Sequence, residues 1–202
     1  MVLQLIVVRH GNTFNKGDVI TRVGGRTDLP LVDSGLEQGQ RVGTYLKKHG
    51  IAPEVVYAAP LKRTMETARQ AGFSEIKPID SFVEIDYGPD ENKPEDQVIA
   101  RVGQEALDKW NADATVPPGW KVDVPQIIKT WVDFANKVAL SGKTTAVFSS
   151  NGIIRFAPYI TGDFEAFSKE HDIKVGTGRI CIFDFNPETG KWVCTGWNIK
   201  PA

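Results

Sequence analysis

Short runs of apolar, β-branched residues alternate along this chain with longer segments whose apolar residues recur at helical spacing. The short runs predict strands at 2–8, 55–58, 76–79, 145–149, 179–185 and 191–197. Helices are predicted between them, at 34–50, 60–68, 94–110, 123–138 and 152–160. Asp123 is expected to cap the helix at 123–138. Strands that alternate with helices favour an α/β fold of three layers, α/β/α, in which helices cover both faces of a mostly parallel central sheet. The last two strands form a hairpin, so we expect them to add an antiparallel edge.

Two local patterns refine these elements. Ser34 and Glu37 have the spacing of a capping box, which predicts that the serine side chain caps the start of its helix. A hairpin turn centred at 187–188 would place Cys181 opposite Cys194 across the last two strands. We interpret these cysteines as reduced, buried thiols.

Composition excludes several classes of protein. The chain has 24 Lys and Arg against 25 Asp and Glu, a net charge of −1, which argues against a general nucleic-acid binder. Its two cysteines are too few for a disulfide scaffold or a four-cysteine zinc site. No apolar run is long enough to cross a membrane, and Val2–Val8 is too short for the core of a signal peptide. We therefore expect one cytoplasmic domain, 1–202, that binds neither nucleic acid nor a membrane; its oligomeric state is not predicted.

The first motif with chemical content, Arg9-His10-Gly11-Asn12-Thr13, directly follows the first predicted strand. Ligands of open α/β sheets bind beyond the carboxyl ends of the strands. A histidine at that place can act as a base or a nucleophile, and a neighbouring arginine can bind phosphate with its forked guanidinium. Taken alone, however, a His-Gly pair at a strand end is more often a plain surface feature.

Four further segments carry polar side chains near strand ends or in loops: 25–38, 58–68, 84–88 and 149–155. Arg63 falls in the first turn of a helix that follows a strand, where a lone arginine is usually a solvated charge. The small residues of 149–155 can present backbone N–H groups to an anion, but they also suit an ordinary glycine turn. Each segment is a weak signal by itself.

Together and in this order, the segments resemble the histidine phosphatase superfamily of phosphoglycerate mutase-like proteins. Val7-Val8-Arg9-His10-Gly11-Asn12-Thr13 is similar to the signature that follows the first strand of that family. The segment 25–38, the helix start Pro60-Leu61-Lys62-Arg63 with Thr67-Ala68, and the loop Glu84-Ile85-Asp86-Tyr87-Gly88 resemble further family blocks. The resemblance runs from the first strand to at least Arg155. It implies phosphoryl transfer to or from a small phosphorylated molecule, with no metal or organic cofactor.

The resemblance also implies a role for individual residues. His10 would be the nucleophile that accepts the phosphoryl group, for which its ring must be neutral and its tautomer held by a partner. Arg9 and Arg63 would clamp the equatorial oxygens and neutralise charge in the transition state. Glu84 would give a proton to the leaving group, which requires a carboxyl group of raised pKa. The residues expected to contact the substrate are Gly11, Asn15, Arg26, Ser150 and Asn151.

The sequence departs from the family pattern at its last motif, which normally begins with a second histidine. Alignment on Ile153-Ile154-Arg155 puts Ser150 at that position. A serine can donate a hydrogen bond but supplies no positive charge, and losing a charge-assisted bond in a closed site costs roughly 2–4 kcal/mol, on the order of 10²–10³ in rate. His49 and His171 are interpreted as surface residues. Smaller departures are Ala59, where the family commonly has serine, and Asn15, which is one position early for a family asparagine.

These patterns predict a phosphatase-like hydrolase of small phosphomonoesters that works through a phosphohistidine at His10, with activity reduced by Ser150. One alternative is a protein that binds a phosphorylated ligand without catalysis. Another is a phosphoglycerate mutase, which is less favoured because the chain is short and the segment 90–124 is not rich in basic residues. Arg155 is a candidate third arginine of the pocket, and Trp110 and Trp120 are interpreted as core or lid packing. The substrate itself is not predicted.

Overall fold

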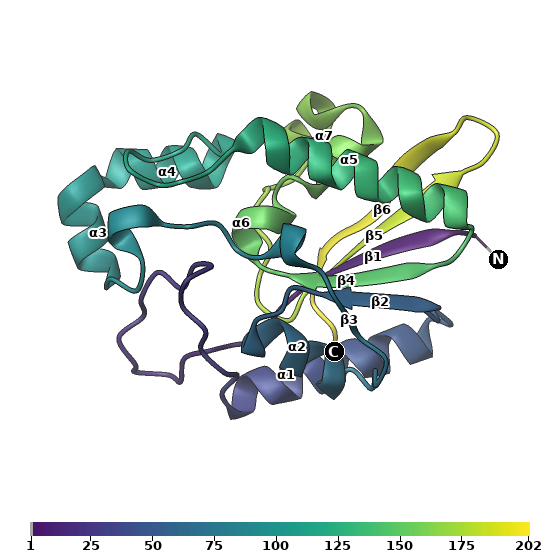
Figure 1. Ribbon diagram of the computed structural model, residues 1–202, viewed down its shortest axis with the longest axis horizontal. Helices are drawn as coiled ribbons and strands as arrows, with labels where there is room; N and C mark the ends of the chain where they lie inside the picture. Colours follow the sequence, from purple (N-terminus) through teal and green to yellow (C-terminus); the bar gives the residue numbers. More distant parts are fainter. Residues whose placement is uncertain (1) are drawn as a thin grey trace.

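A computed structural model describes residues 2–202. Its centre is a six-stranded mixed sheet with the strand order β3-β2-β4-β1-β5-β6 (Figure 1). The strands are β1 Gln4–Arg9, β2 Val55–Ala58, β3 Lys77–Pro78, β4 Thr145–Ser149, β5 Ile180–Asn186 and β6 Lys191–Ile199. Strands β3, β2, β4 and β1 pair in parallel, and β5 and β6 add an antiparallel edge. The expected mostly parallel sheet is therefore confirmed.

Helices cover both faces of the sheet, as the alternating pattern predicts (Figure 1). Within residues 2–202 the α-helices are α1 Asp33–Lys48, α2 Lys62–Gln70, α3 Glu95–Val102, α4 Gln104–Asp113, α5 Val124–Ser141, α6 Asn151–Ile154 and α7 Phe164–Glu170. Successive residues of β1 point to opposite faces: Ile6 and Val8 pack under α1 and α2, and Leu5 and Val7 pack against the core that holds α5. Burial on both faces explains why β1 has no polar residue between Leu5 and Val8.

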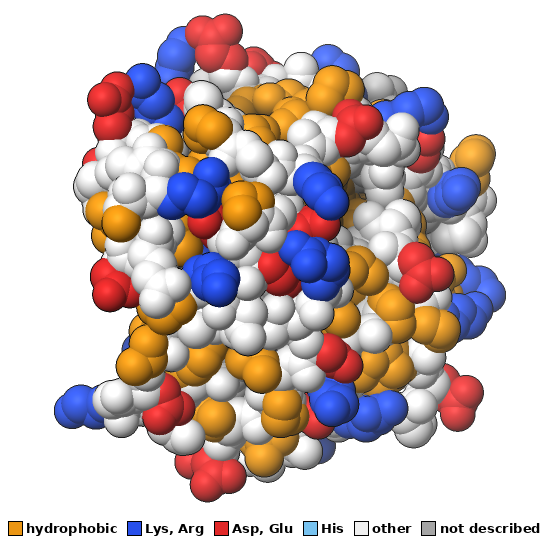
Figure 2. Space-filling model, turned by 60° about the vertical axis from the view of Figure 1, so that its left-hand side comes forward, with side chains coloured by type: hydrophobic (Ala, Val, Ile, Leu, Met, Phe, Trp, Pro, Cys, Tyr) orange, Lys and Arg blue, Asp and Glu red, His pale blue; other side chains and the backbone are white. Residues whose placement is uncertain are grey.

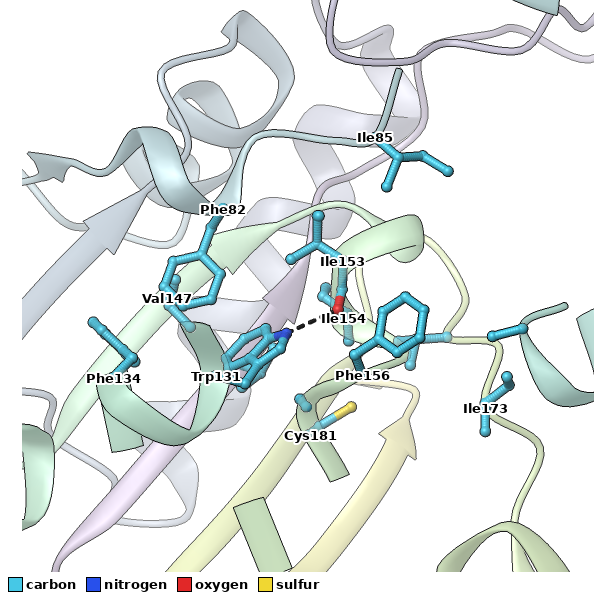
Figure 3. Close-up of a cluster of buried hydrophobic side chains, with 14 of the residues drawn as sticks. Phe82, Ile85, Trp131, Phe134, Val147, Ile153, Ile154, Phe156, Ile173 and Cys181 are labelled. Atoms are coloured by element: carbon cyan, nitrogen blue, oxygen red, sulfur yellow. Dashed lines mark hydrogen bonds between the residues drawn. The ribbon is translucent and has the colours of Figure 1, made fainter. Parts of the chain in front are cut away.

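Trp131 of α5 links the hydrophobic core to the segment that follows β4. Its side chain is fully buried and packs against Phe82, with the ring centroids 4.4 Å apart. The indole N–H donates a hydrogen bond of 2.9 Å to the carbonyl of Ile153 in α6 (Figure 3). A buried indole N–H needs such an acceptor. This bond therefore fixes α6, which begins directly after Ser150, against the core.

Of the two predicted helix caps, the one at Asp123 is confirmed and the one at Ser34 is not. Asp123 accepts a hydrogen bond of 3.0 Å from the Gln126 amide and caps α5 as expected. The capping box at Ser34 is wrong, because Val32 is the N-cap of α1 and no side chain caps it. The Val32 carbonyl instead accepts from the Gly35 amide at 2.8 Å, so Ser34 already lies inside the first turn.

Two of the predicted helices are interrupted. The helix predicted at 94–110 is two helices, α3 and α4, because Gly103 between them has a φ of +82°. The helix predicted at 152–160 ends as α6 at Ile154 and continues as the 3₁₀ helix η3, Ala157–Thr161. Pro158 has no N–H to donate to the Ile154 carbonyl, which accounts for the break.

The terminal hairpin has a different register from the predicted one. Cys194 pairs with Phe183 rather than with Cys181, and irregular pairing occurs between Ile180 and Phe183. The turn is displaced because Asn186 pairs with Lys191 and its carbonyl accepts from the Gly190 amide. Both thiols are free, and Cys181 is buried whereas Cys194 is only partly buried. In residues 2–202, no helix is long and apolar enough to cross a membrane.

Candidate active site

The carboxyl ends of β1 and β4 lie side by side and carry the first and last sequence motifs. Arg9 pairs with Ser149 in the parallel register, and the His10 amide donates to the Ser149 carbonyl at 3.1 Å. This adjacency follows from the strand order, because β4 inserts between β2 and β1. Residues 140 positions apart in the chain thus meet at one edge of the sheet, where open α/β sheets bind their ligands.

His10 lies below the surface, with 6 % of its area exposed, and no histidine shows on the face of the molecule in Figure 2. Its Nδ1 lies 2.7 Å from the carbonyl oxygen of Gly11. Because a carbonyl can only accept, Nδ1 must carry the proton, and this leaves Nε2 with a free lone pair. Burial, followed by the charges of Arg63 and Arg9, holds the pKa of His10 well below its usual value. The ring is therefore neutral at pH 7, as a nucleophile requires.

Two arginines, Arg63 and Arg9, place positive charge near the neutral His10 ring. Arg63 is fully buried, and its Nη1 and Nη2 donate to the carbonyls of Thr27 at 2.7 Å and Gly24 at 3.1 Å. Arg9 donates through Nη1 to the carbonyl of Val175. The Nε–H groups of both arginines are buried without a protein acceptor. Buried donors without an acceptor are rare in native proteins, so these two groups mark a place that suits an anion.

Glu84 faces the same group of charges. Its Oε1 accepts from the Ile85 amide at 2.9 Å, and its Oε2 accepts from the Gly152 amide at 3.2 Å. Burial raises the pKa of Glu84, while Arg63, these two amides and Arg9 oppose the rise. A carboxyl group whose pKa lies above its usual value can both hold and release a proton near neutral pH.

Gly152 shows why the last motif contains a glycine. A β-carbon at this position would lie 2.2 Å from Oε1 of Glu84. The backbone N–H that sequence reasoning offered to an anion is thus used by the Glu84 side chain. Gly11 has a comparable packing role, because a β-carbon there would lie 2.4 Å from the Gly35 carbonyl.

Ser150 and Asn151 sit at the start of α6. The Ser150 hydroxyl is buried and has no hydrogen-bond partner, so it is the third unsatisfied polar group in this region. Asn151 accepts a bond of 2.8 Å from the Val175 amide through Oδ1, and the Val175 carbonyl in turn holds Arg9. Asn151 therefore positions an arginine from a distant part of the chain.

The other predicted contact residues lie on the surface. Asn15 is exposed, and its amide donates to Asp18. Arg26 is exposed and binds the carboxylate of Asp86 and the carbonyl of Gly88. Neither residue has a hydrogen bond to the four predicted catalytic side chains among residues 2–202, and their contact with substrate stays a prediction.

Arg155 and Trp110 form a buried pair behind this region. The Arg155 guanidinium carbon lies 4.0 Å from the centre of the Trp110 ring, and its N–H groups donate to the carbonyls of Asn151 and Trp110. Burial lowers the pKa of Arg155 to about 10, so it remains a cation at neutral pH. Trp110 and Trp120 are both buried in the hydrophobic core, in line with their interpretation as packing residues.

Several residues that hold the site were not singled out by sequence reasoning. Thr67 accepts from the Gly11 amide at 3.0 Å through its hydroxyl. The carbonyls of Gly24, Thr27 and Val175 orient the two arginines. Backbone carbonyls leave no residue-type signal, so only Thr67, which stands in a quoted motif, had a signal that could have been used.

The other two histidines lie elsewhere. His49 is exposed at the end of α1 and stacks on Tyr45, with the centroids 4.2 Å apart. His171 is exposed after α7 and packs against Phe167. Neither side chain joins His10. Among residues 2–202, no cluster of His, Cys, Asp and Glu could hold a metal ion.

Comparisons with known proteins identify similar sequences and similar folds. A 2,3-bisphosphoglycerate-dependent phosphoglycerate mutase from Clavibacter michiganensis subsp. michiganensis is 33% identical over 122 residues, which cover 56% of this chain and 47% of that protein. The chain thus spans about half the length of the curated relatives it matches.

Solved structures share the fold over nearly the whole chain. Phosphoserine phosphatase of Entamoeba histolytica, in complex with 3-phosphoglyceric acid, has a TM-score of 0.75 at 22% identity and covers 98% of this chain and 97% of its own. Mycobacterial glucosyl-3-phosphoglycerate phosphatase has a TM-score of 0.77 at 21% identity, with 97% and 98% covered. The sequence model of the histidine phosphatase superfamily (branch 1) matches residues 5–200, and the chain therefore belongs to that superfamily.

Proposed function

We propose that this protein is a phosphatase that hydrolyses small phosphomonoesters through a phosphohistidine at His10. The observation that carries the proposal is the state of His10, a neutral ring with Nδ1 bound to the Gly11 carbonyl, beside Arg9 and Arg63, whose buried Nε–H groups lack acceptors. A phosphoryl group supplies both an electrophile for Nε2 and acceptors for the arginines.

In the first half-reaction, Nε2 of His10 attacks phosphorus and the bond from phosphorus to the ester oxygen breaks. Arg9 and Arg63 stabilise the charge on the phosphoryl oxygens, and Glu84 gives its proton to the leaving oxygen. In the second half-reaction, the Glu84 carboxylate takes a proton from water, whose oxygen attacks phosphorus. The P–N bond breaks, inorganic phosphate leaves, and His10 and Glu84 regain their starting protonation states.

The charges of the segment 90–124 favour hydrolysis over the mutase reaction. A mutase that works with a bisphosphate needs free cations near the site for the second phosphate. In the segment 90–124, three of the basic residues are already paired with carboxylates: Arg101 with Asp90, Lys109 with Glu105 and Lys121 with Asp86. The solved structures quoted above are also named as phosphatases, of phosphoserine and of glucosyl-3-phosphoglycerate.

The direct test is a search for the phosphoenzyme. We expect inorganic phosphate release from at least one member of a panel of small phosphomonoesters, phosphoserine and phosphorylated glycerates included. During turnover, rapid quenching will trap an acid-labile phosphate on the wild-type chain, and peptide mapping will locate it at His10 rather than at the exposed His49 or His171. Absence of both label and phosphate release across the panel would contradict the proposal.

Ser150 supports a second candidate, a protein that binds a phosphorylated ligand but does not turn it over. Its buried, unpartnered hydroxyl provides a hydrogen-bond donor but no charge where a cation would assist the reaction. If charge is the missing element, Ser150→His will raise kcat/KM by about tenfold or more, up to the roughly 10²–10³ that such a group provides. The measurement is steady-state phosphate release, with Ser150→Ala as the matched control and melting curves for both.

Measurements on the wild-type protein distinguish the two candidate functions. The phosphatase releases phosphate and carries the label on His10, whereas the binding protein takes up inorganic phosphate with neither signal. If the wild type releases phosphate, a Ser150→His variant that melts like it but gains no turnover would show that the hydroxyl already does what this position requires.

A further inference from the structure

A pocket lies beside the strand end that carries His10, and none of the four proposed catalytic residues lines it. Its volume is about 280 Å³, just below the usual range for ligand sites. The walls come from Asn12 after β1, from α1, from the loop that precedes β5 and from the residues that follow β6. A pocket of this size suits a small ligand rather than a protein segment.

Three cations line this pocket: Arg41 of α1, Arg179 before β5, and Lys200 after β6. None of the lining residues in the described part of the chain is acidic. Arg41 pairs with Glu37 at 2.9 Å, and this is the one ion pair that involves these three cations within residues 2–202. The local charge is therefore close to +2, in a protein whose net charge is −1.

The polar part of the wall is held in place by its own hydrogen bonds. Oε1 of Gln38 accepts from the Asn12 amide at 2.8 Å, and the Thr177 hydroxyl donates to Oδ1 of Asn12. Arg179 donates through Nη1 to the Asn198 carbonyl at 3.2 Å, which fixes its guanidinium at the pocket. A site that is already ordered loses little entropy when a ligand binds.

The backbone of the pocket wall is also hydrogen-bonded to the backbone of Arg9 and His10. The Gly178 amide donates to the carbonyls of Arg9 at 3.2 Å and His10 at 3.0 Å, and the Arg179 carbonyl accepts from the Arg9 amide at 3.1 Å. Gly178 has a φ of +65°, and a β-carbon there would lie 2.6 Å from Cβ of Gln38. The pocket and the Arg9–His10 peptide thus share one packed segment.

From this arrangement we infer that the pocket is a second anion site, which binds a phosphate dianion separately from the catalytic centre. A dianion matches the local charge, and an ammonium group with a guanidinium provides charge-assisted donors for its oxygens. The dianion is inorganic phosphate, which the proposed reaction releases, or the phosphate group of a small ester. The site does not require turnover, so it is tested independently of the proposed function.

The experiment is a calorimetric titration with inorganic phosphate, at constant ionic strength maintained with sodium chloride. The wild-type chain is expected to bind two phosphates, one at each site. Lys200→Gln will weaken one of them by about tenfold, the loss expected for one charge-assisted bond. Arg179→Gln will do the same, because it removes the guanidinium whose Nη1 donates to the Asn198 carbonyl. Lys143→Gln removes an exposed lysine at the opposite, amino-terminal end of β4 and should change neither site.

A repeat of the titration with glycerol phosphate on a His10→Ala chain, which cannot consume it, separates the two sources of the dianion. Weaker binding of the ester than of inorganic phosphate assigns the site to the free ion, and the reverse order assigns it to an ester. The inference is overturned if only one phosphate binds, or if Lys200→Gln and Arg179→Gln melt like the wild type and bind two phosphates with unchanged affinity. Absence of a phosphohistidine would refute the proposed reaction but leave this binding result intact.

Discussion

Replacing His10 with alanine will abolish the phosphoenzyme and lower kcat by about 10⁴–10⁶, the range found when a nucleophile is removed from a covalent mechanism. The reason is that no other side chain in this region offers a free imidazole nitrogen. His49 and His171 are exposed, and each packs against an aromatic ring of the adjacent helix. The measurements are rapid-quench labelling and steady-state phosphate release.

The loss of activity must be separated from a loss of fold. The His10 side chain makes one hydrogen bond, to the Gly11 carbonyl, so its removal should cost about 1–2 kcal/mol of stability. Chemical denaturation will measure this difference, and the variant will remain folded at 25 °C. The matched control is His49→Ala, which removes an exposed histidine and should leave kcat unchanged. Phosphate release by His10→Ala at more than a tenth of the wild-type rate would exclude His10 as the nucleophile.

The ends of an element were predicted correctly where they are set by neighbouring residues in the sequence, and incorrectly where they are set by a contact with a distant residue. The strand at 145–149 was predicted to the residue, because an uninterrupted apolar run that ends in serines needs no distant information. The start of α1 was wrong because it depends on a contact across the chain. The Val32 amide donates to the Asn12 carbonyl at 3.1 Å, which sets the path of the chain into the helix and makes Val32 the N-cap.

The helix α7 was not predicted at all, although Asp163 caps it by accepting from the Ala166 amide at 3.0 Å. Its seven residues give less than two turns, too few for an apolar period to stand out. The break at Gly103 could have been anticipated, because a glycine within a helical pattern lowers the stability of that helix.

The site could be predicted as a set of residues but not as a structure. Arg9, His10 and Arg63 stand in recognisable motifs, and the fold brings the elements that carry them to one edge of the sheet. The groups that orient them are backbone carbonyls far away in the chain: Val175 lies 166 positions from Arg9, and Gly24 lies 39 from Arg63. No residue type marks such a carbonyl, so a single sequence does not indicate it.

Arg63→Leu is expected to lower kcat/KM by about 10²–10³, because Arg63 supplies positive charge to the proposed phosphoryl site. Its guanidinium also holds two backbone carbonyls, so the same change affects the stability of the fold. Leucine fills part of the same space but donates nothing to the phosphoryl oxygens. The carbonyls of Gly24 and Thr27 lose their donors as well, so we expect a loss of about 1–3 kcal/mol in the free energy of unfolding. Steady-state kinetics and urea denaturation measure the two effects.

Two further variants separate the loss of activity from the loss of stability. Arg69→Leu removes an exposed arginine from the same helix, α2, and should change neither kcat/KM nor stability by a measurable amount. Arg63→Lys keeps a positive charge but cannot reach both carbonyls and an anion with a planar fork, so its loss of kcat/KM should lie between those of wild type and leucine. Wild-type kinetics in a folded Arg63→Lys variant would show that charge alone is sufficient at this position.

The pH dependence distinguishes a direct role of Arg63 from a purely structural one. Arg63 is the strongest of the influences that oppose the burial-driven rise in the pKa of Glu84. Without this positive charge the carboxylate form of Glu84 is less favoured, so its pKa rises further. Hydrolysis of the phosphohistidine needs that carboxylate as a base, and the acidic limb of its pH profile will therefore move to higher pH in Arg63→Leu but not in Arg69→Leu. An unmoved limb, measured by single-turnover decay of the trapped phosphoenzyme, would mean that Arg63 does not act on Glu84.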